Sequence, residues 1–84
     1  MRISLELLEE CWWAVGLLSE TAGAEFNYDK IAKLKRAIQG KSPLLYSRFN
    51  FVLGEFRSTE DWADEDRQRF GKLMASLYEC ERGK

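Results

Sequence analysis

The stretch that decides the fold of this chain is SPLLYSRFNFVLGEF, residues 42–56. Ser42 followed by Pro43 is a typical helix start, because serine can cap the first turn and proline at the first helical position gives up only an N–H that would be unpaired. From Leu45 onward, large apolar residues follow at spacings of four, three and four positions. This spacing predicts an amphipathic helix that buries one face.

Two helical segments precede this stretch. Asn27 can cap the nearer one, which carries a narrow apolar stripe to about Gln39, and Gly40 is a typical residue just beyond a helix C-terminus. Ser4 can cap the other, over about residues 4–20. One half of that helix is predicted to face the core, and its apolar side chains are Leu5, Leu7, Leu8, Cys11, Trp12, Ala14, Val15 and Leu18.

A fourth helix is predicted after the central stretch. Residues 58–61 are Ser-Thr-Glu-Asp, which can cap a helix and place acids in its first turn, and apolar positions then recur to about Arg82. Because all the connections are short, we expect one domain over residues 1–84, an all-α antiparallel bundle of about four helices. A core of three helices with one irregular segment is the alternative.

Most catalytic and metal-binding constellations lack a required residue in this chain. The chain has no histidine, which excludes Ser-His-Asp and Cys-His nucleophile systems. Its glycines fit no phosphate-binding loop. Cys11 and Cys80 form no metal-binding motif and are predicted to be reduced thiols that pack as small apolar groups. We therefore expect no enzymatic activity, no metal site and no cofactor.

The first residues do not favour export from the cell. Glu6, Glu9 and Glu10 would interrupt the apolar part of a signal peptide. No apolar run approaches the roughly 20 residues that a membrane-spanning helix needs. The sequence therefore predicts a cytoplasmic protein without a membrane segment.

The net charge of −1 hides an uneven distribution. Residues 1–25 carry one arginine against five glutamates, and residues 58–84 carry five basic against seven acidic residues. Between them, residues 26–57 carry seven basic residues against two acidic ones. Such segregation predicts surfaces of opposite sign on one small domain.

Several apolar residues fall outside the predicted core faces. Trp13 and Leu17 project from the acidic half of the first helix, which carries Glu6, Glu9, Glu10 and Glu20. Leu44 and Phe51 likewise leave the apolar face of the third helix. Aromatic residues ringed by charge are typical of protein-binding surfaces, although a neighbouring segment could cover either pair.

Charged residues give two further candidate surfaces. Five acids crowd the start of the fourth segment, and Asp61, Asp64 and Glu65 are those expected to steer a partner with a basic surface. Asp66 falls inside the apolar arc there, which predicts an ion pair, for example with a lysine of the second helix, or a carboxylate presented to a ligand. The second helix carries the basic residues Lys30, Lys33, Lys35 and Arg36, which could contact nucleic-acid phosphates.

A small non-catalytic protein-binding domain is the function that these patterns favour. Its residues would be Trp13, Leu17, Glu6, Glu9, Glu10, Phe51, Asp61, Asp64 and Glu65. Immunity proteins, antitoxins and phage-encoded inhibitors of host defence are of comparable size and charge, so the predicted action is to inhibit or neutralise another macromolecule. The alternatives are a nucleic-acid-binding or regulatory module that uses the basic second helix, and an obligate homodimer. The acidic pI of about 5.5 disfavours nucleic acid.

Overall fold

The computed structural model describes residues 3–21, 28–42, 44–56 and 58–83 of the chain. They form four α-helices and one short 3₁₀ helix, with no strand among these residues. The helices are α1 (Leu5–Thr21), α2 (Tyr28–Gln39), α3 (Leu45–Phe56) and α4 (Asp64–Arg82), and the 3₁₀ helix is η2 (Ser58–Asp61). The predicted all-α fold is confirmed.

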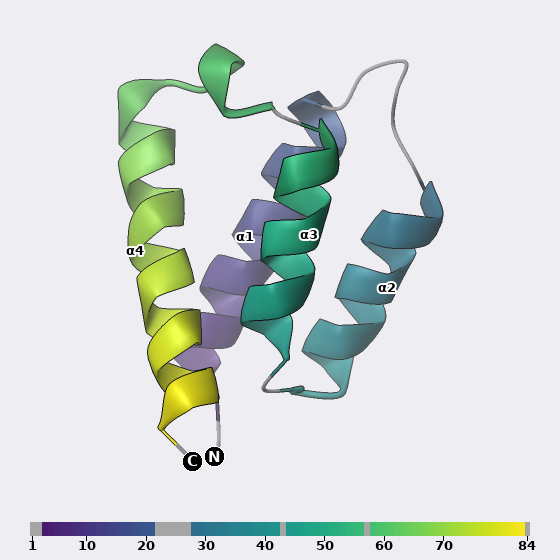
Figure 1. The fold of residues 1–84 in the computed structure, drawn as a ribbon, viewed down its shortest axis with the longest axis vertical. Coiled ribbons are helices and arrows are strands. Elements are labelled where there is room, and N and C mark those ends of the chain that lie inside the picture. Colours follow the sequence, from purple (N-terminus) through teal and green to yellow (C-terminus); the bar gives the residue numbers. More distant parts are fainter. Residues whose placement is uncertain (1–2, 22–27, 43, 57, 84) are drawn as a thin grey trace.

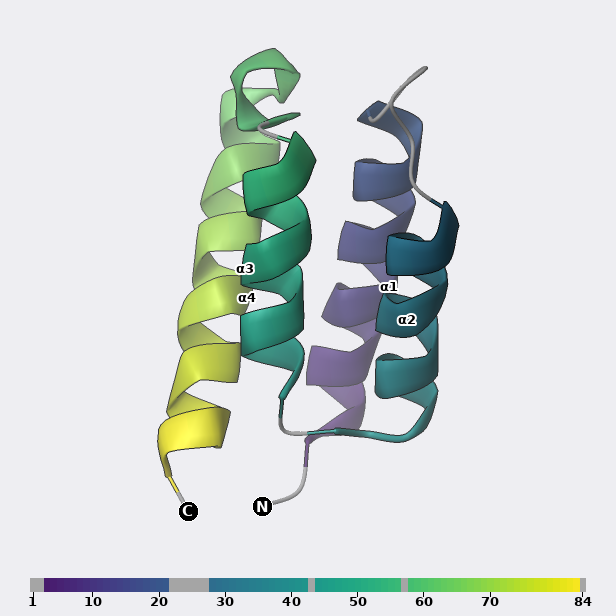
Figure 2. The same ribbon diagram turned by 45° about the vertical axis from the view of Figure 1, so that its right-hand side comes forward.

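The helices form a closed ring of neighbours. Each helix packs against the next in the chain, and α4 returns to pack against α1. The described ends of the chain lie at the same end of the bundle (Figure 1). The view in Figure 2 separates the bundle into two layers, α1 with α2 and α3 with α4. This is the antiparallel arrangement that short connections predict.

The core lies along the axis of the bundle and takes side chains from every helix. Leu18, Leu34, Phe49 and Leu77 are fully buried, one from each helix in turn. The ring of Phe49 contacts that of Phe70 edge-on, with 6.1 Å between the centroids. These residues belong to the apolar stripes predicted from spacing, so the stripes position the four helices.

Serine caps two helix starts, as predicted. The Leu7 N–H donates to the Oγ of Ser4 at 3.1 Å, and the Leu44 N–H donates to the Oγ of Ser42 at the same distance. These bonds satisfy amide groups that have no partner within the helix. Asn27 and Pro43, two further residues predicted to lie at helix starts, are outside the described residues.

The end of α2 differs from the prediction by one residue. Gly40 is not the left-handed residue; Lys41 is, with a φ of 55°. The N–H of Lys41 donates to the Ile38 carbonyl and that of Ser42 donates to the Ala37 carbonyl, each at 3.0 Å. This pair of bonds is a Schellman motif with a lysine in the position that glycine usually takes.

The fourth helix begins later than the capping sequence predicts. Residues Ser58–Asp61 form η2, and α4 starts only at Asp64. Between them Trp62 is buried, its ring packs edge-on against Phe70, and its Nε1–H donates to the Oγ1 of Thr21 at 3.2 Å. Burying a large aromatic ring against α1 and α4 outweighs the continuation of one exposed helix.

Among the described residues, no helix has both the length and the apolar character that a membrane span requires.

A candidate binding groove between two helices

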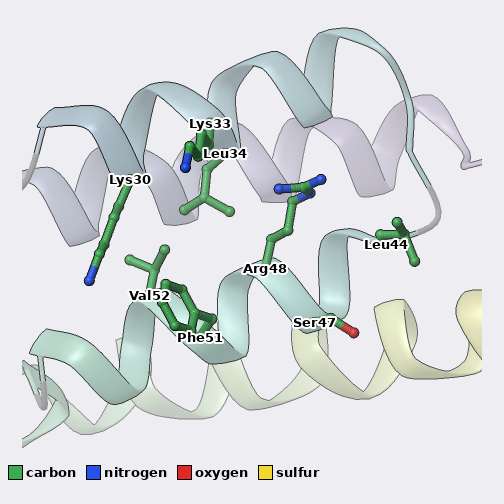
Figure 3. A pocket seen from close by; sticks show the side chains of 8 residues that line it. All are labelled: Lys30, Lys33, Leu34, Leu44, Ser47, Arg48, Phe51 and Val52. Carbon is green, nitrogen blue, oxygen red and sulfur yellow. The ribbon is translucent and has the colours of Figure 1, made fainter.

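An open groove runs between α2 and α3 on the outside of the bundle. Its volume is about 400 Å³, and the residues that line it are Lys30, Lys33, Leu34, Leu44, Ser47, Arg48, Phe51 and Val52. Figure 3 shows these side chains on α2 and α3, with Leu44 at one end of the groove and Phe51 towards the other. We call this feature the α2–α3 groove.

The α2–α3 groove has a buried apolar floor and exposed apolar residues at its rim. Leu34 and Val52 are core residues, so they form a fixed base. Phe51 is 60% exposed and Leu44 is 46% exposed. The prediction that these two residues leave the apolar face of the third segment is therefore confirmed. Their position over a fixed floor makes the groove a candidate site for apolar side chains of a partner.

Cations surround this apolar surface. The ammonium group of Lys30 pairs with the carboxylate of Glu55 and lies 4.9 Å above the Phe51 ring. Lys33 and Arg48 are exposed on opposite walls and form no ion pair with any described residue. Figure 3 shows the Arg48 side chain extending from α3 towards α2. The walls therefore offer positive charge that no acid of the described residues neutralises.

A second hollow continues the groove towards the turn between the two helices. It has a volume of about 370 Å³ and is lined by Lys33, Arg36, Ala37, Ser42 and Arg48. Two of its residues, Lys33 and Arg48, also line the first hollow. Lys35, the remaining basic residue predicted for a nucleic-acid surface, is exposed but lines neither hollow. The combined surface is elongated along the helices rather than round.

The predicted surface around Trp13 is closed by α4. Trp13 and Leu17 are half-buried and pack against the core, which is the covered alternative that the sequence left open for this pair. The guanidinium of Arg69 lies 4.1 Å from the Trp13 ring centroid and binds both carboxylate oxygens of Glu10, at 2.8 and 2.5 Å. The hydrogen bond from Arg69 lowers the pKa of Glu10. One long side chain thus covers the Trp13 ring and pairs with Glu10.

Two apolar residues of α1 that the helical wheel placed on the core side are exposed. Leu5 is 74% exposed and Trp12 is 43% exposed. In a bundle of four helices each helix buries a narrower stripe than half its circumference, so residues at the edge depend on what the neighbours cover. Sequence spacing carries no information about how far the Arg69 side chain reaches. The helical wheel therefore placed Trp12 on the core side and Trp13 on the outer side, whereas Trp12 is the exposed residue of the two.

The remaining acids are spread over separate elements. Glu6 and Glu9 are exposed on α1. Asp61 ends η2, whereas Asp64 and Glu65 open α4, so these exposed acids do not share one helix start. Asp66 is half-exposed and its charge acts on Arg69 of the same helix. The ion pair suggested between Asp66 and a lysine of the second helix is not formed, since the only bridge of such a lysine joins Lys30 to Glu55 among the described residues.

Cys11 is not presented as a nucleophile. Burial raises the pKa of the Cys11 thiol to about 12, and the neighbouring Glu10 and Cys80 add to the shift. A thiol with this pKa is protonated at neutral pH. Within the described part of the chain, no cluster of three or more His, Cys, Asp or Glu residues could hold a metal ion.

Comparison with known proteins gives no relative from which to assign a site. No protein-family model matches the chain, and no curated protein and no solved structure matches it either. The assignment of the α2–α3 groove as a candidate binding site is therefore based on its geometry alone.

Proposed function

We propose that this chain is a small non-catalytic domain that binds another protein through the α2–α3 groove, and that it inhibits or neutralises that protein by covering the surface it occupies. The observation that carries this proposal is the exposed Phe51, which lies with Leu44 along an apolar floor, beside Lys33 and Arg48, which have no ion-pair partner among the described residues. Aromatic side chains next to arginine dominate the energetics of many protein interfaces.

The proposal keeps the predicted class of function but assigns it to the α2–α3 groove in place of the surface around Trp13. Trp13 is covered by Arg69, whereas Phe51 is open. Phe51 and Leu44 expose apolar surface at the rim of a groove whose floor is also apolar, and a binding role accounts for this arrangement better than a structural one. Phe51 belongs to the predicted partner-binding residues, and Lys30 and Lys33 come from the predicted basic surface.

Affinity capture from a lysate of the source cell tests this function. Tagged wild-type chain is compared with Phe51→Ser and with the matched control Leu5→Ser, which alters an exposed apolar residue outside the groove. We expect a protein partner that the wild type and Leu5→Ser retain and that Phe51→Ser loses by at least about tenfold, equivalent to about 1.4 kcal/mol. Capture that is equal for all three chains would contradict the proposal.

Nucleic-acid binding is the second candidate, and the exposed cations along the groove favour it. Lys33, Arg36 and Arg48 line one hollow, and phosphates could bind them. However, the acidic pI of about 5.5 opposes association with a polyanion. Nuclease treatment of the lysate separates the two candidates, because it would abolish capture that depends on nucleic acid and leave capture of a protein unchanged.

A further inference from the structure

We infer that the occupant of the α2–α3 groove is an acidic amphipathic helix of the partner protein, with its apolar side chains on the groove floor and its carboxylates against Lys33, Arg36 and Arg48. This inference rests on the proposed function and names the chemistry of the partner.

The shape of the surface favours a helix over a compact ligand. The two hollows share Lys33 and Arg48 and so form one track along α2 and α3. The exposed apolar residues Leu44 and Phe51 lie seven positions apart, which corresponds to about two helical turns or roughly 10 Å. An amphipathic helix presents apolar side chains at positions i, i+4 and i+7 over the same distance, and a groove between two helices is a common receptor for it.

The charge of the groove is graded along its length. At the Phe51 end, Glu55 neutralises Lys30. Towards the turn between α2 and α3, Lys33, Arg36 and Arg48 have no acidic partner among the described residues. A complementary helix therefore carries its carboxylates mainly near this turn and its largest apolar side chain near Phe51. Desolvating three cations without such carboxylates would oppose binding.

Other anionic occupants fit the same cations less well. A nucleic-acid backbone would satisfy the charges but would leave the apolar floor and Leu44 facing polar sugar and phosphate groups. A flat lipid surface would reach the exposed rim but not the buried base formed by Leu34 and Val52. An acidic amphipathic helix satisfies the floor and the walls together.

Titration of the ¹⁵N-labelled full chain with three synthetic peptides tests this inference. The peptides are about 16 residues long, carry leucine or phenylalanine at i, i+4 and i+7, and differ only in having glutamate, glutamine or lysine at the flanking positions. We expect the glutamate peptide to bind at least about tenfold more tightly than the lysine peptide. We also expect the shifted amide signals to belong to α2 and α3.

Charge variants sharpen this experiment. The double variant Lys33→Glu/Arg48→Glu should reverse the order of the peptides, whereas Lys35→Glu, which changes a cation of α2 outside the groove, should preserve it. Equal affinity for the glutamate and lysine peptides, or shifts centred on other helices, would overturn the inference. So would a single-stranded oligonucleotide or vesicles of anionic lipid that shift the groove signals at lower concentration than the glutamate peptide.

The two experiments fail separately. If capture returns a Phe51-dependent protein while the glutamate peptide shows no preference, the proposed function stands and the acidic helix is wrong. If the glutamate peptide binds in the groove but capture does not depend on Phe51, the chemistry of the groove is right and its role in the captured complex is wrong.

Discussion

At the scale of single residues, the turn between α2 and α3 contains a backbone conformation that its side chain disfavours. Lys41 has a φ of 55°, a left-handed conformation in which a side chain crowds the backbone. Gly40, next to it, is not the residue that needs this freedom. A Cβ added at Gly40 would lie 3.4 Å from the Arg36 carbonyl oxygen and 3.8 Å from that of Ala37, which are ordinary contacts.

Lys41→Gly should therefore stabilise the domain. We expect the free energy of unfolding to rise by about 0.5–1 kcal/mol, because glycine adopts the left-handed conformation without a steric cost. Urea unfolding followed by circular dichroism measures this change. Gly40→Ala is the control and should be neutral or slightly stabilising. A loss of about 1 kcal/mol in Gly40→Ala would show that Gly40 holds the left-handed position instead.

At the scale of helices, sequence periodicity predicted the interior of each element better than its ends and edges. The residues at the centre of each apolar stripe, such as Leu18 and Phe49, are buried as expected. For the two tryptophans of α1, the predicted order of exposure was the reverse of the observed one, since their exposure depends on side chains from other helices. The Phe51 rim of the groove was predictable from its own helix, but the groove itself requires the packing of α2 against α3.

The start of α4 shows the same limit. The predicted cap at residues 58–61 forms η2 instead, because burying Trp62 interrupts the helical path. The residue that precedes α4 is Ala63, which has extended dihedral angles, φ −62° and ψ 151°, and makes no side-chain capping bond. A strong local capping pattern was thus overridden by tertiary burial, and the true helix start was left with a poor cap.

Ala63→Ser should supply the missing cap. In the extended conformation of residue 63, a serine Oγ can accept from an amide of the first turn, and we expect about 1 kcal/mol of added stability. Ala75→Ser is the control, since Ala75 is exposed inside α4 and serine there should cost about 0.5 kcal/mol of helix propensity. Both changes are measured by urea unfolding. Equal effects at the two positions would contradict the assignment of Ala63 as the N-cap.

At the scale of the whole molecule, the charged residues of the α2–α3 groove differ from those of the contact that closes the bundle. In the α2–α3 groove, Lys33 and Arg48 have no acidic partner among the described residues, whereas Arg69 and Glu10 pair with each other in the contact between α1 and α4. There Arg69 joins Glu10 and Trp13 of α1, residues that are far from it in sequence. Glu10 of α1 is thus paired within the contact that closes the ring of helices. This is why the basic groove is the better candidate for binding a partner.

Removing this link should loosen the bundle as a unit. We expect Arg69→Ala to lower the midpoint of thermal unfolding by about 3–6 °C, while Arg67→Ala, which removes only an exposed pair with Asp64 on the same helix, should change it by less than about 2 °C. The hydrogen bond from Arg69 lowers the pKa of Glu10 from about 4.5, so the bridge stabilises the folded state fully above that pH and is lost as the pH falls through the lowered pKa. The difference between wild type and Arg69→Ala should accordingly shrink in acid, as differential scanning fluorimetry at a series of pH values would show. Equal midpoints for Arg69→Ala and Arg67→Ala at pH 7 would mean that the closure of the bundle depends on its apolar core alone.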